Sequence, residues 1–255
     1  MIELRRCEWT TAMPAEVVAF SLGRGSAAAT ADPYAGDTIC DYTGDSPAHV
    51  AANREALAAR LGIAPERIVT ARQTHSCIAR RIGTGTSREE LQGIDALVTT
   101  ERNLLIGINT ADCVPILLCD AARGVIAAVH AGWRGTAAGI AGVAVATMLR
   151  CGASIGSIYA HIGAAIGLDA YEVGEEVVEA LAAAGLSADS FGRRFPSGRW
   201  HVDLQRHNAL QLERLGIDAA RIAFDPRCTY SDPALYSARR QGIASGRNFT
   251  ALLLR

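Results

Sequence analysis

Three short segments of this chain place metal-capable side chains beside turn-forming residues. They read QTHS, TADCVP and HAGWRG, and they contribute His75, Cys113 and His130. Two imidazoles and a thiolate suit Zn²⁺ and leave its fourth tetrahedral position open, which is the arrangement of a catalytic rather than a structural zinc. The residue types therefore indicate a metal that presents water or an oxyanion to a substrate.

Spacing alone does not single out these residues. The separations of 38 and 17 residues belong to no local metal motif, and the chain holds six histidines and seven cysteines. Taken one at a time, each histidine reads more simply as a strand-end side chain bonded to a backbone carbonyl, and the cysteine as a small buried hydrophobe.

The residues that follow His130 favour a functional interpretation. Gly132 and Gly135 let the backbone approach a ligand closely, while Trp133 offers a stacking face and Arg134 a fork of anion-binding donors. A helix that starts just after Arg134 would also direct unpaired backbone N–H groups toward the same place, where they favour phosphate. We therefore expect an anion site beside the metal.

Composition excludes several classes of partner. A formal net charge of -1 provides no field that would attract nucleic acid or an anionic membrane. The longest apolar run, at residues 137–149, is too short to span a bilayer. The seven cysteines form no CxxC pair, which argues against a disulfide framework. We expect a cytoplasmic monomer that acts on a small molecule, without nucleic-acid or membrane partners.

Helices and strands must bring these side chains together. A chain of 255 residues is long enough for one domain, which we expect to span residues 1–255. Ser46 and Pro47 begin a helix that ends at Gly62. Five β-prone runs follow: RIVTA, IDALVT, LLIGI, VPILLCD and GVIAAVH. After them, helical spacing predicts a helix over residues 136–150.

The second half adds a strand (SIYAHIG), a helix (EVGEEVVEALAAAG), a helix over residues 203–215 and a final strand (FTALLLR). Strands thus occur both in direct succession and in alternation with helices. This order predicts a mixed, layered α/β (α+β) domain, with the three reactive segments at strand ends.

The blocks QTHS, TADCVPILL and HAGWRG, in this order and at these distances, resemble the signature blocks of the YfiH family. That family is also called the laccase-domain or polyphenol oxidase family, or peptidoglycan editing factor. The resemblance continues through GDSPAHVAANREALAARLG, GIDALVTT, AIGLDAYEVGEEV, DLQRHNALQLERLGI and CTYSDPALYSARRQG. The chain departs from it at residues 168–170, where many relatives carry a proline and a cysteine pair, so no cysteine ligand is proposed there.

The resemblance implies a four-layer α/β/β/α sandwich with mixed sheets, of the CNF/YfiH-like type. It also implies zinc on His75, Cys113 and His130, and a purine nucleoside phosphorylase. Such an enzyme converts adenosine, inosine, guanosine or methylthioadenosine, with phosphate, to the base and ribose 1-phosphate. Adenosine deaminase activity is implied as well.

Further residues are expected to join the three ligands in the site. Asp112 is a predicted catalytic residue, because its carboxylate, or that of Asp95, could shuttle a proton. The expected substrate or phosphate contacts come from the matching blocks and from the SARRQG segment, and they are Arg72, Gln73, Asp95, Arg134 and Arg240.

Three alternatives remain open. His₂Cys is also a copper ligand set when an axial methionine completes it, which here means Met1, Met13 or Met148; a multicopper laccase, however, needs more than six histidines. Cys113 and His130 could instead form the nucleophile and base of a hydrolase that edits peptidoglycan precursors.

A structural zinc would need a fourth protein ligand, Cys77 or Cys119. Cys119 lies six residues beyond Cys113 on one predicted strand, roughly 20 Å away, and cannot share its metal.

Overall fold

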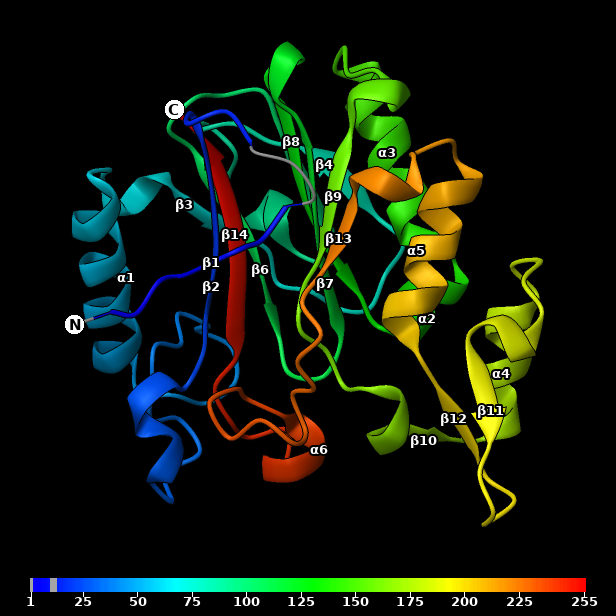
Figure 1. Cartoon of the computed structure of the whole chain (residues 1–255). Helices are drawn as coiled ribbons and strands as arrows, with labels where there is room; N and C mark the ends of the chain where they lie inside the picture. The colour runs from blue at the N-terminus through cyan, green and yellow to red at the C-terminus, as the bar shows by residue number, and fades with distance from the viewer. Residues whose placement is uncertain (1, 10–12) are drawn as a thin grey trace.

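Two large sheets face each other in the computed structural model, which describes residues 2–9 and 13–255 (Figure 1). The five-stranded sheet has the order β1 (Arg5–Arg6), β2 (Val17–Leu22), β14 (Asn248–Leu254), β6 (Leu105–Thr110) and β3 (Ile68–Thr70). The six-stranded sheet has the order β13 (Ile222–Phe224), β9 (Tyr159–Ile162), β7 (Val114–Asp120), β8 (Val125–Ala131), β5 (Ala96–Thr99) and β4 (Ala79–Arg81). Most pairs are antiparallel, but β3 pairs with β6 in parallel in the first sheet, and β4 with β5 and β13 with β9 in the second, so both sheets are mixed.

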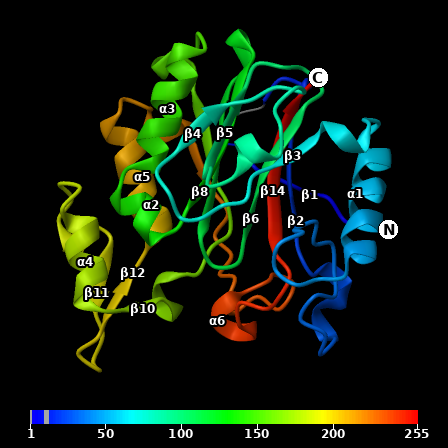
Figure 2. The ribbon, with the colours of Figure 1, turned by 180° about the vertical axis from the view of Figure 1, so that it is seen from behind.

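Helices cover the two outer faces of this pair of sheets (Figures 1 and 2). Helix α1 (Pro47–Leu61) lies on the five-stranded sheet. Helices α2 (Trp133–Ala137), α3 (Ile140–Arg150) and α5 (Leu204–Arg214) lie on the six-stranded side. Helix α4 (Glu175–Ala182) packs there beside a small antiparallel sheet of β10 (Glu172–Val173), β12 (Trp200–Val202) and β11 (Gly192–Arg194). The short α6 (Ala238–Gln241) precedes β14.

Three buried clusters fill the spaces between these layers. The first includes Leu57 of α1 and Phe249 of β14, the second joins Ile106 of β6 to Leu117 of β7, and the third joins β7 and β8 to α3 and α5. Burying a sheet on both faces requires strands that are apolar throughout, as in VPILLCD and GVIAAVH. The predicted four-layer α/β/β/α sandwich is confirmed.

Most predicted elements lie where the sequence placed them. Helix α1 begins at Pro47 and ends before Gly62, whose φ of 65° is left-handed. Helix α5 follows Asp203, whose side chain accepts the Arg206 N–H. The five β-prone runs became β3, β5, β6, β7 and β8, but they are divided between the two sheets.

Two predicted helices were wrong in extent. The helix expected over residues 136–150 begins at Trp133 and breaks before Ile140, because Gly139 adopts a φ of 77° that an α-helix cannot hold. The helix expected from Glu172 begins at Glu175, since Glu172 and Val173 pair with β12.

The β7–β8 hairpin brings two of the reactive segments to one edge of the six-stranded sheet. In its register Val114 is opposite Ala131 and Pro115 is opposite His130. Cys113, one residue before β7, therefore lies at the same edge as His130. Among residues 2–9 and 13–255, no helix combines the length and apolarity needed to cross a bilayer.

Candidate metal centre

His75, Cys113 and His130 converge at this sheet edge. Their candidate ligand atoms all lie within 4.8 Å of one another, and Cys113 Sγ is 3.6 Å from His75 Nε2. Nitrogen and sulfur at ~2.1 and ~2.3 Å from a tetrahedral zinc ion are about 3.6 Å apart. The donor types and the separation of Sγ and Nε2 therefore fit zinc.

Asp95 holds two of these ligands in place. One carboxylate oxygen accepts the His130 Nδ1–H at 2.6 Å and the His75 backbone N–H at 3.1 Å. The other accepts the backbone N–H groups of Thr74 and Ser76 and the Ser76 hydroxyl. A carboxylate that fixes one ring nitrogen of a ligand histidine leaves the other, here Nε2, for the metal.

The same contacts explain an unusual backbone at His75. Its φ is 61°, in the left-handed region that a residue with a β-carbon rarely adopts. This conformation belongs to a turn in which the N–H groups of Thr74, His75 and Ser76 all point to one carboxylate. Such strain is typical of residues that a surrounding network holds in a functional position.

The electrostatics of the centre favour a thiolate. Burial disfavours the charged form of Cys113, but the neighbouring His130 and His75 outweigh it and lower the pKa of Cys113 to about 6. Burial likewise opposes charge on His130, yet the Cys113 thiolate and the Asp95 carboxylate raise its pKa to about 9. A deprotonated thiol is the form that binds metal.

Glycine is required beside the ligands. A β-carbon at Gly132 would lie 2.5 Å from His75 Cδ2 and 3.1 Å from Cys113 Sγ. Because its φ of -70° suits any residue, the limit at Gly132 is steric. The close backbone approach that the sequence predicts at HAGWRG therefore occurs at Gly132, where a side chain would meet His75 and Cys113.

Asp112 accepts hydrogen bonds from two distant segments of the chain. One of its oxygens accepts the Thr229 hydroxyl at 2.6 Å and the other the Arg239 backbone N–H at 2.7 Å. Asp112 has a φ of 88° and ties the Cys113 loop to the start of α6. These contacts let Asp112 position the Cys113 loop, and its role as a proton shuttle stays a prediction. The oxygens of Asp95 are occupied in the same way.

Gln73 is bonded to the protein rather than presented to a substrate. Its side-chain amide donates to the Asn109 carbonyl at 2.8 Å and accepts the Asn109 N–H at 2.8 Å. These bonds attach the His75 segment to β6. Arg72 is exposed and lines a cavity of about 600 Å³ together with Arg54 and Arg88.

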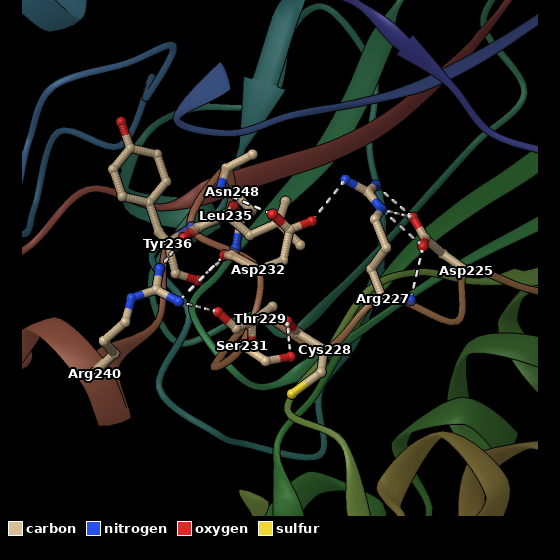
Figure 3. A network of polar contacts seen from close by, with 11 residues as sticks. Asp225, Arg227, Cys228, Thr229, Ser231, Asp232, Leu235, Tyr236, Arg240 and Asn248 are labelled. Carbon is tan, nitrogen blue, oxygen red and sulfur yellow. Dashed lines mark hydrogen bonds and ion pairs between the residues drawn. The ribbon is translucent and has the colours of Figure 1, made fainter. Parts of the chain in front are cut away.

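The sequence selected Arg240, but its guanidinium is enclosed by its own loop (Figure 3). It donates to the backbone carbonyls of residues 229, 230, 232 and 235. These bonds fold the loop onto α6 and leave little of Arg240 for an anion. In the same network Arg227 pairs with Asp225.

Sequence reasoning missed Tyr171 and Arg239. The Arg239 guanidinium carbon lies 5.5 Å from the centre of the Tyr171 ring. Burial and the charges of Cys113 and Asp112 raise the pKa of Tyr171 to about 12, while Arg239 and Arg134 act in the opposite sense. Tyr171 therefore stands within electrostatic reach of the centre. The segments SARRQG and AYEVGEEV, which carry these residues, belong to the family resemblance. Their sequence does not reveal which arginine lies over the Tyr171 ring.

Two other cysteines considered as a fourth ligand are engaged elsewhere. The Cys77 thiol faces the Ala138 carbonyl at 3.1 Å, and Cys119 is buried in the cluster between the sheets. Within the described ranges the metal-capable group contains three residues. Of the methionines considered for copper, Met148 is in the α3 core, Met13 packs against the cluster between the sheets, and Met1 lies outside the described residues.

Fold and site together define a layered α/β protein with a three-residue candidate metal centre at a sheet edge. The family model described as multi-copper polyphenol oxidoreductase laccase matches residues 19–255. The chain belongs to this laccase-domain family, whose solved members include YfiH and DUF152 proteins.

Several relatives show how far the likeness extends. "Adenosine deaminase RL5", from an unknown prokaryotic organism, is 40% identical over 99% of this chain and 99% of its own. A "Purine nucleoside phosphorylase" of Bacteroides thetaiotaomicron is 36% identical over 87% of this chain and 86% of its own. Crystal structures of Bacillus licheniformis YfiH (TM-score 0.87, 28% identity) and Geobacillus stearothermophilus YlmD (0.86, 32%) each cover 94% of this chain, which covers 93% of theirs.

Proposed function

We propose that this chain is a zinc-dependent purine nucleoside phosphorylase that also deaminates adenosine. The names of its relatives support a reaction on purine nucleosides. The observation that carries the proposal is the convergence of His75, Cys113 and His130 with a Sγ–Nε2 separation of 3.6 Å. Two imidazoles and a thiolate are a catalytic zinc set with one position free.

The three candidate ligands differ in exposure, and this difference indicates from which side a substrate can reach the centre. His130 is 4% exposed and fixed by Asp95, whereas His75 is exposed. A substrate can therefore reach the centre from the His75 side. Bound there, zinc would supply Lewis acidity toward an oxygen nucleophile, either water or phosphate.

The chain's own residues supply orientation and anion binding. Asp95 keeps the His130 ring in one tautomer, and Gln73 and Asp112 hold the backbone on either side. Arg134 is exposed, stacks on Trp133 with its guanidinium carbon 4.2 Å from the ring centre, and can donate to phosphate. Water and phosphate would use the same open position, so the two reactions should compete.

The test combines metal analysis with product analysis. We expect about one zinc per chain, adenine and ribose 1-phosphate from adenosine when phosphate is abundant, and inosine when phosphate is absent. Chelation should stop both reactions. Cys113→Ala should lose zinc and both activities, while Cys151→Ala, which alters a cysteine at the end of α3, should keep them.

Other outcomes would identify the alternatives. Copper near full occupancy with an intense thiolate-to-copper absorption would support the oxidase. Activity that survives chelation but is lost in Cys113→Ala would support a cysteine hydrolase. A phosphate-independent deamination rate alongside phosphorolysis would disprove the shared position while leaving the zinc assignment intact.

A further inference from the structure

Arg239, an arginine that the sequence did not select, lies beside the loop that carries Cys113. Arg239 is the second residue of α6, and its backbone N–H donates to Asp112, the residue that precedes Cys113. Its side chain extends over Tyr171, with 5.5 Å between the guanidinium carbon and the ring centre. One residue therefore bridges the ligand loop and the aromatic ring.

The donors of Arg239 are largely uncommitted. One terminal nitrogen donates to the Glu172 carbonyl at 3.3 Å. The nearby Glu172 carboxylate pairs instead with Arg199 and His201. In the described part of the chain no carboxylate forms an ion pair with Arg239. By contrast, both terminal nitrogens of the next residue, Arg240, donate to backbone carbonyl groups.

A matched arginine shows what a purely structural role looks like. Arg193 also stacks on an aromatic ring, with 4.9 Å to the centre of Phe195, but it pairs with Asp169 at 2.9 Å. Arg239 has the same stacked arrangement without the acidic partner. An exposed, planar guanidinium that is held on a ring and left unpaired is prepared for bidentate contact with an anion such as phosphate.

We infer that Arg239, supported on Tyr171, forms with Arg134 the phosphate subsite of this enzyme. The Arg239 guanidinium lies over the Tyr171 ring, and its backbone N–H is bonded to the residue before Cys113, whereas Arg134, four residues beyond His130, stacks on Trp133. Arg134 approaches from α2 and Arg239 from α6. The identity of the anion rests on the proposed function; the assignment of Arg239 rests on its contacts.

Binding of inorganic phosphate to the zinc-loaded protein, measured by calorimetry, tests the inference without turnover. Arg239→Gln should weaken phosphate binding about tenfold, which corresponds to the loss of one charge-assisted contact. Arg239→Lys should restore part of the affinity, because it keeps the charge but not the fork. Arg193→Gln, the matched control, should bind as the unaltered protein does.

A pair of changes at Tyr171 separates the ring from its hydroxyl. Tyr171→Phe keeps the ring under Arg239 and should retain phosphate affinity, whereas Tyr171→Ala should lose it. Zinc content should be unchanged in every variant, because none removes a ligand. The phosphate KM of phosphorolysis should rise in parallel with the dissociation constant, and it should stay at its original value in Arg193→Gln.

Distinct results would overturn distinct claims. Unchanged phosphate affinity in Arg239→Gln, or no phosphate binding by the unaltered protein, would remove Arg239 from the site. Phosphate binding that depends on Arg239 in a protein that performs no phosphorolysis would sustain the subsite and refute the proposed reaction.

Discussion

Replacing Asp95 by asparagine isolates the group that orders the candidate metal centre. The side chain keeps its shape, but one acceptor oxygen becomes an amide that donates. Asp95 is 1% exposed, and its two oxygens accept five hydrogen bonds from Thr74, His75, Ser76 and His130. In either orientation the new NH₂ meets two N–H donors that it cannot satisfy.

These contacts determine how much Asp95→Asn lowers the free energy of unfolding and the metal affinity. Two lost hydrogen bonds to a charged acceptor, at about 1.5–3 kcal/mol each, predict a decrease of roughly 3–6 kcal/mol in the free energy of unfolding. Loss of the carboxylate that orients a ligand histidine lowers metal affinity by about 10–100-fold. Asp95→Asn should therefore weaken both folding and zinc binding.

Urea unfolding of the metal-free protein and competition with a zinc chelator measure the two effects separately. Asp120→Asn is the matched control, because Asp120 is fully buried at the opposite end of β7 and accepts the N–H groups of Arg123 and Ser154. We expect that control to lose stability and to keep its zinc affinity.

The reasoning would be refuted by an Asp95→Asn protein that binds zinc as tightly as Asp120→Asn does. Equal zinc affinity with reduced stability would show that Asp95 supports the turn at residues 74–76 but does not orient His130.

Three further predictions concern the same centre. Gly132→Ala should reduce zinc content while changing secondary structure little, since the added carbon meets the ligands themselves; normal occupancy would contradict the short distances at Gly132. Arg134→Ala should raise the phosphate KM or lower kcat for phosphorolysis, and unchanged values of both would remove it from the site. Hydrogen bonds from His130 and Ser76 outweigh burial and lower the pKa of Asp95 to about 2, so its roughly 2 kcal/mol contribution is present above pH 4 and lost toward pH 2. The stability difference between the unaltered protein and Asp95→Asn should shrink over that interval in acid unfolding curves.

Local patterns in the sequence predicted much of the fold. Ser46, Pro47 and Gly62 carry the chemistry of a helix start and stop, and the helix ends where they indicate. The apolar runs at β7 and β8 are buried on both faces, as their composition requires. The division of strands between two sheets was not predictable, because pairing depends on contacts distant in sequence, such as β14 between β2 and β6.

The two wrong helix boundaries arose where a single glycine or a single strand pairing determines the local structure. Gly139 splits a segment whose alanine and β-branched residues favour a continuous helix. Glu172 and Val173 fit a helical pattern but are taken by β12. In both places tertiary context overrides local propensity.

In the candidate site, too, some features could be predicted from the sequence and others could not. The three proposed ligands were selected by their residue types and by the family resemblance, and their atoms converge. The surrounding roles were harder to assign, because adjacent residues of a short helix point in different directions. Arg239 faces Tyr171 while Arg240 is enclosed by carbonyls, and no periodicity in SARRQG distinguishes them.

The two aspartates connect the segments that carry the three candidate ligands. His75 lies in the connection from β3 to β4, whereas Cys113 and His130 lie on the hairpin of β7 and β8. Asp95 links His75 to His130 by accepting a hydrogen bond from each, and Asp112 links the Cys113 loop to α6. Both oxygens of each carboxylate accept hydrogen bonds, so each carboxylate holds backbone or ring positions beside the candidate ligands. Because Asp95 fixes the His130 ring and the His75 backbone, zinc affinity should depend on Asp95 although it is not a candidate ligand.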